Sequence, residues 1–190
     1  LPETRTPESF SPRVRRSTAI PSRYRSPKPS QRNGPHPTDS TNSHSNYARL
    51  YHGLYDLETG ALRYFNVYGP RQVASDYSGV ISIFIDQALS GEDITVHGDG
   101  EPTRDFVYID DVVRANLNAA TTDAVGEAYN VGTGESVTIR ELAELIQDIT
   151  ETDSDIVHTD ARTGDIEHSK ADISKANADL GYEPTVSLRD

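Results

Sequence analysis

The chain changes character at Asn46–Tyr47, and this boundary limits what each side of it can fold into. Residues 1–46 hold 8 of the 11 prolines and 8 of the 18 lysines and arginines, but only 3 of the 30 acidic residues. The rest of the chain therefore holds 10 basic and 27 acidic residues, so the two segments carry formal charges of +5 and −17. A segment rich in proline and poor in apolar residues cannot bury enough surface to offset its chain entropy. We expect residues 1–46 to be disordered and residues 47–190 to form one acidic folded unit.

Composition excludes several classes of protein. The chain has no cysteine, so it has neither disulfides nor a thiolate metal site, and no metal site is expected. No apolar run approaches the ~20 residues of a membrane-spanning helix, and the basic N-terminal segment lacks the apolar core of a secretory signal. We therefore expect a cytoplasmic protein without a membrane partner.

The acidic segment has only two lysines, Lys170 and Lys175. A strong excess of acid with little lysine is typical of proteins from salt-loving organisms, because high ionic strength screens the repulsion between like charges. The composition favours a halophilic source, and an ordinary acidic protein is the alternative.

After residue 46, apolar residues recur at spacings that alternate between strand and helix. Strand-like runs are predicted at 61–67, 94–97, 105–109 and 128–131, and helices at 47–55, 80–89, 138–149 and 172–180. A further helix after Asp110 or Asp111 is expected to bury Val112, Val113 and Leu117. Thr138 and Glu141 form a capping box. The helix behind it is expected to bury Ile139, Leu142, Ala143, Leu145, Ile146 and Ile149. Alternating strands and helices indicate an α/β fold.

Polar residues at the ends of two apolar runs are candidate ligand-binding groups. Asn66 stands where a strand meets Gly69-Pro70, and polar side chains at the carboxyl ends of strands in open α/β sheets face the ligand crevice. Arg104 is the only basic residue between Arg71 and Arg114, and a planar guanidinium matches two oxygens of a diphosphate. The alternatives are that Asn66 only caps the turn, and that Arg104 forms a surface ion pair of little energetic value with Asp105 or Glu101.

A third polar segment is DARTGD, at 160–165. Arg162 is isolated among acidic residues, Gly164 permits close approach of the backbone, and the Asp165 carboxylate can accept from ribose hydroxyls. A solvated loop is the alternative. Two isolated arginines in an acidic segment indicate an anionic ligand, because the overall field disfavours anions unless cations are placed for them.

Five segments together resemble the C-terminal half of the NAD-dependent epimerase/dehydratase family, within the extended short-chain dehydrogenase/reductases. The group includes UDP-glucose 4-epimerase. The segments are LRYFNVYGPRQ, VISIFIDQALSG, VHGDGEPTRDFVYIDDVVRA, AYNVGTGESVTIREL and the run from Arg162-Thr-Gly-Asp165 to DISKANADLGYEP. The resemblance covers Tyr47 to Asp190. It implies the substrate-binding half of a Rossmann-like fold.

The resemblance also implies a UDP-sugar or another nucleotide sugar as the substrate. Asn66 would hydrogen-bond the sugar diphosphate, Arg104 and Arg162 would grip its phosphates, and Asp165 would bind a ribose hydroxyl. Members of this family are often homodimers.

The implied cofactor is NAD, which oxidises a sugar carbon so that the transient ketone is reduced from the other face or dehydrated. Tyr64 and Phe65 would border the nicotinamide, and Val80 and Phe84 would lie near the base of the substrate.

Two motifs that the family needs for catalysis do not match. The sequence contains no GxxGxxG dinucleotide cradle. At the family spacing, the tyrosine and lysine of YxxxK would stand at positions held by Pro37 and Thr41. Tyrosines 47, 51, 55 and 68 are not followed by lysine four residues later. We therefore expect no catalytic residue in this chain, which would be a truncated enzyme that is inactive alone.

A shifted reading frame explains the basic segment. With permissible codons, reading Arg16–Pro21 two nucleotides into the first codon yields Val-Tyr-Gly-Asp-Pro, which is the motif after the family's catalytic serine. The same shift of Gly34–Thr41 can yield a tyrosine at the catalytic position, followed four residues later by glutamine. We therefore expect residues 1 to about 45 to be frame-shifted, with the normal frame resuming near Ser45. Codons in the gene that do not permit Val-Tyr-Gly would exclude this explanation.

Two other functions remain open. The acidic segment is a candidate for a non-catalytic nucleotide-sugar-binding module. The basic segment is a candidate for nucleic-acid binding, but it has few aromatic residues, Phe10 and Tyr24, and it is joined to a strongly acidic segment. We therefore expect no nucleic-acid partner.

Overall fold

The structure is a computed structural model that describes residues 37–72, 79–162 and 164–190, with side chains from Ser45 onwards. The predicted disorder of residues 1–36 lies outside the described residues. Within the described ranges, every helix is too short or too polar to cross a membrane.

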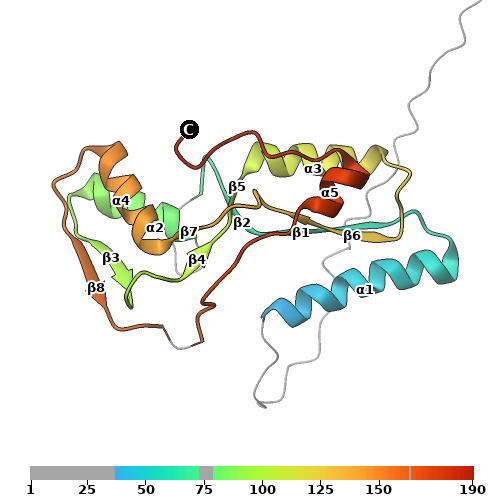
Figure 1. Ribbon diagram of the computed structural model, residues 1–190, viewed down its shortest axis with the longest axis horizontal. Coiled ribbons are helices and arrows are strands. Elements are labelled where there is room, and N and C mark those ends of the chain that lie inside the picture. Colours follow the sequence, from blue (N-terminus) through green and yellow to red (C-terminus); the bar gives the residue numbers. More distant parts are fainter. Residues whose placement is uncertain (1–36, 73–78, 163) are drawn as a thin grey trace, which may run out of the picture.

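Four pairs of strands form the framework of the molecule (Figure 1). Three pairs are parallel, namely β1 with β6, β2 with β5, and β3 with β8, whereas β4 is antiparallel to β7. The strands are β1 (Gly60–Tyr64), β2 (Asn66–Tyr68), β3 (Ile94–His97), β4 (Thr103–Arg104), β5 (Phe106–Tyr108), β6 (Glu127–Val131), β7 (Val137–Thr138) and β8 (Ile156–Thr159). Parallel strands separated by helices confirm the predicted α/β class.

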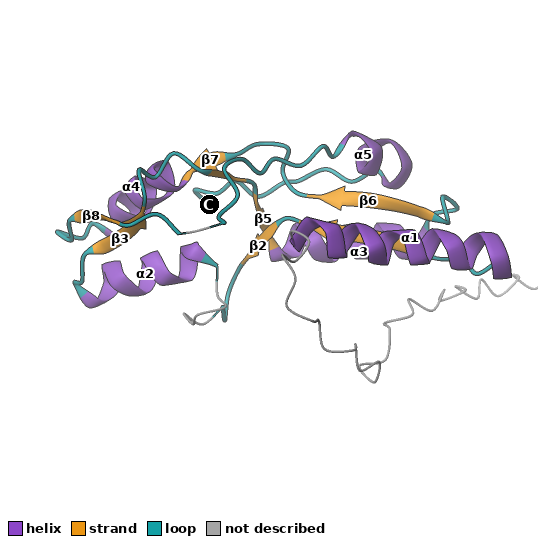
Figure 2. Ribbon diagram, turned by 90° about the horizontal axis from the view of Figure 1, so that it is seen from below, coloured by secondary structure: helices purple, strands orange, loops and turns teal. Residues whose placement is uncertain are grey.

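Helices cover the strands in two groups at opposite ends of an elongated molecule (Figure 1). At one end, α1 (Pro37–Tyr55) lies along one face of the β1–β6 pair, and α3 (Ile109–Thr121) and α5 (Ser174–Leu180) lie on the other (Figure 1). Seen from below, α1 and α3 overlap (Figure 2). At the other end, α2 (Val80–Ser90) and α4 (Ile139–Thr150) pack on each other and on β3.

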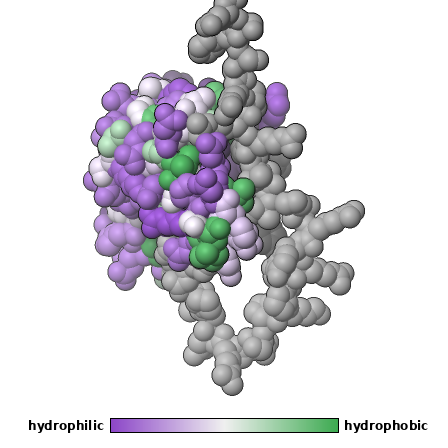
Figure 3. Space-filling view, turned by 90° about the vertical axis from the view of Figure 1, so that its right-hand side faces the viewer, coloured by the Kyte–Doolittle hydropathy of each residue, from purple (hydrophilic) through white to green (hydrophobic). Residues whose placement is uncertain are grey.

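Each group of helices encloses its own hydrophobic core. One core forms where α2 and α4 meet β3, and includes Phe84, Ile94, Val96, Leu142 and Ile146. The other joins α3 and α5 to the central strands, and includes Val107, Tyr129, Val131, Ala176 and Tyr182. The surface at the end of the molecule that carries the second core is mainly hydrophilic, with small separate hydrophobic patches (Figure 3).

Local signals determine the start of α4, as predicted, and the end of α2. The Thr138 hydroxyl accepts from the Glu141 amide at 3.0 Å, and the Glu141 carboxylate accepts from the Thr138 amide at 2.7 Å, which completes the capping box. Gly91 ends α2 with a positive φ of 70°, a conformation that costs glycine little.

The first helix begins earlier than expected. Residues 37–46 were predicted to be disordered, but α1 runs from Pro37 through the boundary at residue 46 to Tyr55. Tertiary contacts explain the difference, because Ser45 is 2% exposed and its hydroxyl accepts from Arg63 Nε at 2.9 Å. A helix anchored in this way propagates outwards at little cost, and proline is well tolerated in a first turn.

The predicted strand at 61–67 is divided in two at Phe65. The Phe65 amide donates to the Val131 carbonyl, at the end of β6, whereas the Asn66 amide donates to the Asp105 carbonyl, just before β5. The chain thus changes pairing partner between consecutive residues. The strand predicted at 105–109 is confirmed as β5, which is shorter because α3 already begins at Ile109, and the separate strand β4 precedes it.

Three apolar side chains predicted to be buried are exposed. Val113 and Leu117 are 48% and 62% exposed, because α3 instead turns Asp111, Val112 and Ala115 inwards. Ile149, in the last turn of α4, is 52% exposed. An apolar pattern identifies the helix, but the positions of its neighbours select the buried face.

Candidate functional site

A pocket of about 250 Å³ opens between two helix N-termini and the strands beside them. The first turns of α2 and α4 reach it from one side, and β2, β4 and β5 reach it from the other. Its lining is Asn66, Val67, Tyr68, Gln72, Gly79, Val80, Ile81, Arg104, Phe106 and Ile139. Three residues predicted to bind a ligand, Asn66, Val80 and Arg104, therefore share one pocket.

Asn66 is held by the backbone of a distant segment. Its Nδ2 donates to the carbonyl oxygen of Asp105 at 2.8 Å, and its own amide donates to the same oxygen at 3.1 Å. A carboxamide has two N–H donors and an acceptor oxygen, so this bond leaves capacity for a ligand. The bond to Asp105 thus orients the Asn66 side chain and leaves its second N–H and its oxygen for a ligand.

Arg104 supplies the positive charge among the described residues that line the pocket, and its guanidinium is held by several contacts. Its Nη1 donates to the carbonyls of Thr103 at 2.8 Å and Ile166 at 2.6 Å, and its Nη2 lies 2.5 Å from Asp165 Oδ1. Its side chain is only 13% exposed. The alternative pairing with Glu101 is wrong, because Glu101 pairs with Arg140. Asp105 is not the partner either, because its carboxylate serves backbone donors elsewhere.

Asp105 is a site residue that the sequence reasoning assigned only as an alternative partner. Its fully buried carboxylate accepts from the Thr133 amide and hydroxyl, both at 2.8 Å, and from the Gly134 and Ala171 amides, both at 3.0 Å. The sequence signal that could have identified Asp105 was an acidic residue directly before the apolar run FVYI. Because its backbone carbonyl also orients Asn66, Asp105 joins the pocket to two distant loops.

Tyr68 forms part of the pocket wall with its phenol protonated. Burial raises the pKa of Tyr68 above its usual value, and the neighbouring Tyr108 and Asp190 raise it further. The hydroxyl donates to the Ser187 carbonyl at 3.1 Å, so the C-terminal segment reaches this wall.

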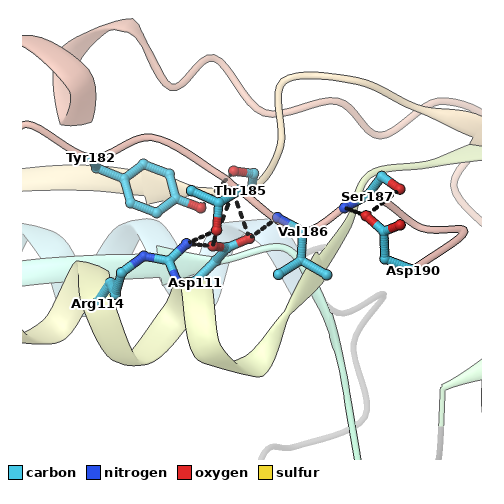
Figure 4. A network of polar contacts seen from close by, with 8 residues as sticks. Asp111, Arg114, Tyr182, Thr185, Val186, Ser187 and Asp190 are labelled. Atoms are coloured by element: carbon cyan, nitrogen blue, oxygen red, sulfur yellow. Dashed lines mark hydrogen bonds and ion pairs between the residues drawn. The ribbon is translucent and has the colours of Figure 1, made fainter.

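A second buried carboxylate, Asp111, holds that C-terminal segment against α3 (Figure 4). It accepts from the amides of Thr185 at 3.1 Å and Val186 at 3.3 Å, and it pairs with Arg114. The nearby Tyr182 hydroxyl donates to the Gly132 carbonyl at 2.8 Å. These contacts secure residues 182–187, including the Ser187 carbonyl that Tyr68 uses.

Five of the predicted residues do not line the pocket, and one of them, Asp165, reaches it only through its ion pair with Arg104. Phe84 is 2% exposed in the core around α2, so it lies too deep to contact a base directly. Arg162 is exposed, in the segment that leads to Asp165. Tyr64, at the end of β1, is 48% exposed and its hydroxyl donates to Asn116 Oδ1 at 2.9 Å. Phe65 is half-buried between β1 and β2.

Two described strands lead directly into helices without the glycines of a dinucleotide-binding site. Such a site needs a strand that enters a helix through glycines, whereas β5 enters α3 at Tyr108 and β7 enters α4 at Thr138. The YxxxK spacing occurs once, at Tyr24 and Lys28, outside the described residues and away from positions 37 and 41. Tyr64 and Phe65 are the only groups that the sequence reasoning offers to NAD.

The pocket thus combines an amide and a guanidinium side chain within an α/β framework. A family model described as "NAD dependent epimerase/dehydratase family" matches residues 41–132. The putative UDP-glucose 4-epimerase of Methanocaldococcus jannaschii is 46% identical over 101 residues, which are 53% of this chain and 32% of that protein. UDP-glucuronic acid decarboxylase 6 of Arabidopsis thaliana is 39% identical over 140 residues, 74% of this chain and 40% of that protein.

The fold agrees with these sequence matches. The crystal structure of UDP-glucose 4-epimerase from Thermotoga maritima, solved with UDP-glucose, superposes with a TM-score of 0.75 at 43% identity. The match covers 78% of this chain and 48% of the other. The chain belongs to the NAD-dependent epimerase/dehydratase family. It spans about a third of the length of the first curated relatives and about half of the solved structures that it matches.

Proposed function

We propose that the described part of the chain is the nucleotide-sugar-binding part of an enzyme of UDP-glucose 4-epimerase type, and that the pocket receives the diphosphate. The observation that carries this proposal is the meeting of Arg104 and Asn66 with the first turns of two helices. The dipole of a helix favours an anion at its N-terminus, and a guanidinium supplies the full positive charge. At α4 only the dipole contributes, because the amides of Ile139, Arg140 and Glu141 already donate to Pro102, Gly100 and Thr138.

The size of the pocket supports a diphosphate rather than a whole nucleotide sugar. At about 250 Å³ it is smaller than the roughly 300–1,000 Å³ of typical sites for small molecules. The nucleoside and the sugar would therefore extend beyond it. We propose that Val80 lies on the nucleoside side, and that Arg162 and Asp165 approach the ligand from the segment beside Arg104.

We expect this chain to bind without turning over its ligand. When bound, NAD supplies the hydride chemistry of the family. The proton transfer that accompanies it needs a tyrosine and a lysine, and positions 37 and 41 hold Pro37 and Thr41. We therefore propose that this chain by itself acts as a non-catalytic nucleotide-sugar-binding module. Catalysis would require groups that these residues do not provide.

Calorimetric titration of the full chain with UDP-glucose tests the proposal. Arg104→Ala should weaken binding by about tenfold or more, because a hydrogen bond to a charged group contributes about 1.5–3 kcal/mol. Arg189→Ala is the matched control, because Arg189 is 70% exposed and pairs with Asp148 away from the pocket residues. Equal affinities of the two variants would show that the pocket is not the binding site.

An activity assay tests the expectation that the chain does not turn over its ligand. The chain incubated with NAD and UDP-glucose should form no UDP-galactose. Formation of UDP-galactose by the purified chain would show that an acid–base pair exists outside positions 37 and 41.

A further inference from the structure

The C-terminal residues 182–188, here called the strap, lie against α3 and continue towards α4 (Figure 1). The buried carboxylate of Asp111 accepts from the amides of Thr185 at 3.1 Å and Val186 at 3.3 Å (Figure 4). Arg114 pairs with the same carboxylate, and its Nη2 also donates to the Thr185 hydroxyl. The middle of the strap is therefore fixed to the first turns of α3.

The end of the strap is attached to the other group of helices. Leu188 is half-buried and packs against the core that α2 and α4 form with β3. The ion pair between Arg189 and Asp148, just beyond the strap, is exposed and contributes little. The first turns of α2 and α4 line the pocket, so the strap links α3 to the two helices that border the pocket.

Between these two attachments, the strap contacts a side chain of the pocket wall. The Tyr68 hydroxyl donates to the Ser187 carbonyl at 3.1 Å, and Tyr68 also lines the pocket. Tyr68 and Leu188 pack against the same core. The ring of Tyr68 meets the ring of Tyr108 edge-on, with 5.4 Å between the ring centroids. The position of Tyr68 in the wall thus depends on where the strap lies.

Beyond Tyr182, the strap buries little of its surface. Its exposed residues are Glu183, Thr185 and Ser187, and its half-buried residues are Pro184, Val186 and Leu188. Segments with little buried apolar surface open at a free-energy cost well below that of global unfolding. The strap can therefore exchange between an attached and a detached state while the rest of the fold persists.

We propose that the strap positions the pocket wall for the ligand, and that Tyr68 and Leu188 are the positioning residues through which it acts. This inference rests on the proposed function. A wall that is already in place loses less freedom when a ligand binds, so the attached state binds the ligand more tightly than the detached state. Because such coupling is reciprocal, a bound ligand must favour the attached strap by the same factor.

Calorimetric titration of the full chain with UDP-glucose tests the effect of the strap on the pocket. Tyr68→Phe removes a bond to the strap, and Leu188→Ala weakens its attachment at a side chain that does not line the pocket. Each substitution should weaken binding about threefold or more. Tyr129→Phe is the control for the first, because the Tyr129 hydroxyl also donates to a backbone carbonyl at 3.1 Å but lies outside the pocket. Leu89→Ala, at an exposed position of α2, is the control for the second, and both controls should keep the affinity of the parent chain.

Hydrogen exchange of the parent chain gives a measurement that a purely structural strap would not change. Saturation with UDP-glucose should slow the exchange of the Thr185 and Val186 amides about threefold or more, because these amides exchange when the strap detaches. The Ser174 amide is the control, because it also donates to a carboxylate, that of Asp172, but lies on α5 outside the strap. Its exchange should not change.

The outcomes separate this inference from the proposed function. If the parent chain binds UDP-glucose but Leu188→Ala binds it equally well, and the ligand leaves the strap amides unchanged, the strap is only structural and the inference is wrong. If Tyr68→Phe alone weakens binding and exchange does not respond to the ligand, Tyr68 contacts the ligand itself and the strap has no part in binding. If the parent chain does not bind UDP-glucose, the proposed function fails and the inference fails with it.

Discussion

Asp105→Asn is the substitution that most directly tests how the pocket is held together. The carboxylate is fully buried, and its four contacts are all with donors. Oδ1 accepts from the Thr133 amide and hydroxyl, and Oδ2 accepts from the Gly134 and Ala171 amides. Asparagine has nearly the same shape, but one of its two terminal atoms is a donor. Whichever way the amide turns, one pair of donors faces an NH₂ group instead of an oxygen.

The expected cost follows from that pairing. A buried donor left without its acceptor costs about 1–3 kcal/mol, and bonds to a charged acceptor lie towards the upper end. If the NH₂ group faces Thr133, the Thr133 hydroxyl can accept from it, so one backbone donor is left unpaired and the loss in the free energy of unfolding is about 3 kcal/mol. A loss of that size is a large part of the roughly 5–15 kcal/mol that stabilises an ordinary domain. A change from aspartate to its near-isostere should therefore destabilise strongly.

Urea unfolding of the full chain, followed by far-ultraviolet circular dichroism, measures this loss. Asp148→Asn is the matched control, because its carboxylate is exposed, and it should change the free energy of unfolding by less than about 0.5 kcal/mol. In Asp105→Asn, the urea midpoint should fall while the slope of the transition stays the same. A variant within 0.5 kcal/mol of the parent chain would refute the view that this carboxylate joins the loops at 132–134 and 171 to the pocket.

Two further substitutions test individual contacts. Thr138→Ala removes the acceptor for the Glu141 amide and should lower the free energy of unfolding by about 1 kcal/mol in the same urea assay. The control Thr121→Ala, at the exposed end of α3, should lower it by less than half of that. Equal effects of the two substitutions would contradict the role of the capping box. Tyr182→Phe leaves the Gly132 carbonyl without its donor and should cost about 1–2 kcal/mol at neutral pH. Burial, with the nearby Asp105 adding to it and Arg114 opposing it, raises the pKa of Tyr182 from 10.0 to about 12. The neutral phenol therefore stabilises the fold fully below pH 10, and this contribution is lost as the pH rises towards 12. The decline in stability over that range should be shallower in Tyr182→Phe than in the parent chain, and identical declines would show that Tyr182 does not titrate as its burial implies.

The features that the sequence predicted correctly depend on residues close together in the chain. The Thr138–Glu141 box, the strand at 94–97 and the helix from residue 80 are all determined by neighbours within about one helical turn. The α/β class and the family resemblance followed from the order of such local segments. Asn66 was identified as a candidate because it is a polar group where an apolar run meets a turn, and Arg104 because it is an isolated basic residue in an acidic segment.

Contacts between distant segments could not be read in this way. Arg104 meets Asp165 across 61 positions, and Asn66 meets the Asp105 carbonyl across 39. The start of α1, the exposure of Val113 and the division of β1 from β2 likewise depend on packing partners far along the chain. The sequence by itself determined the elements, the family and the chemistry of the candidate side chains, because those follow from local pattern and residue type. Only the tertiary structure showed that Asp165 is the partner of Arg104 and that buried Asp105 links the pocket to two distant loops. Hydrogen-bond partners depend on distances in space.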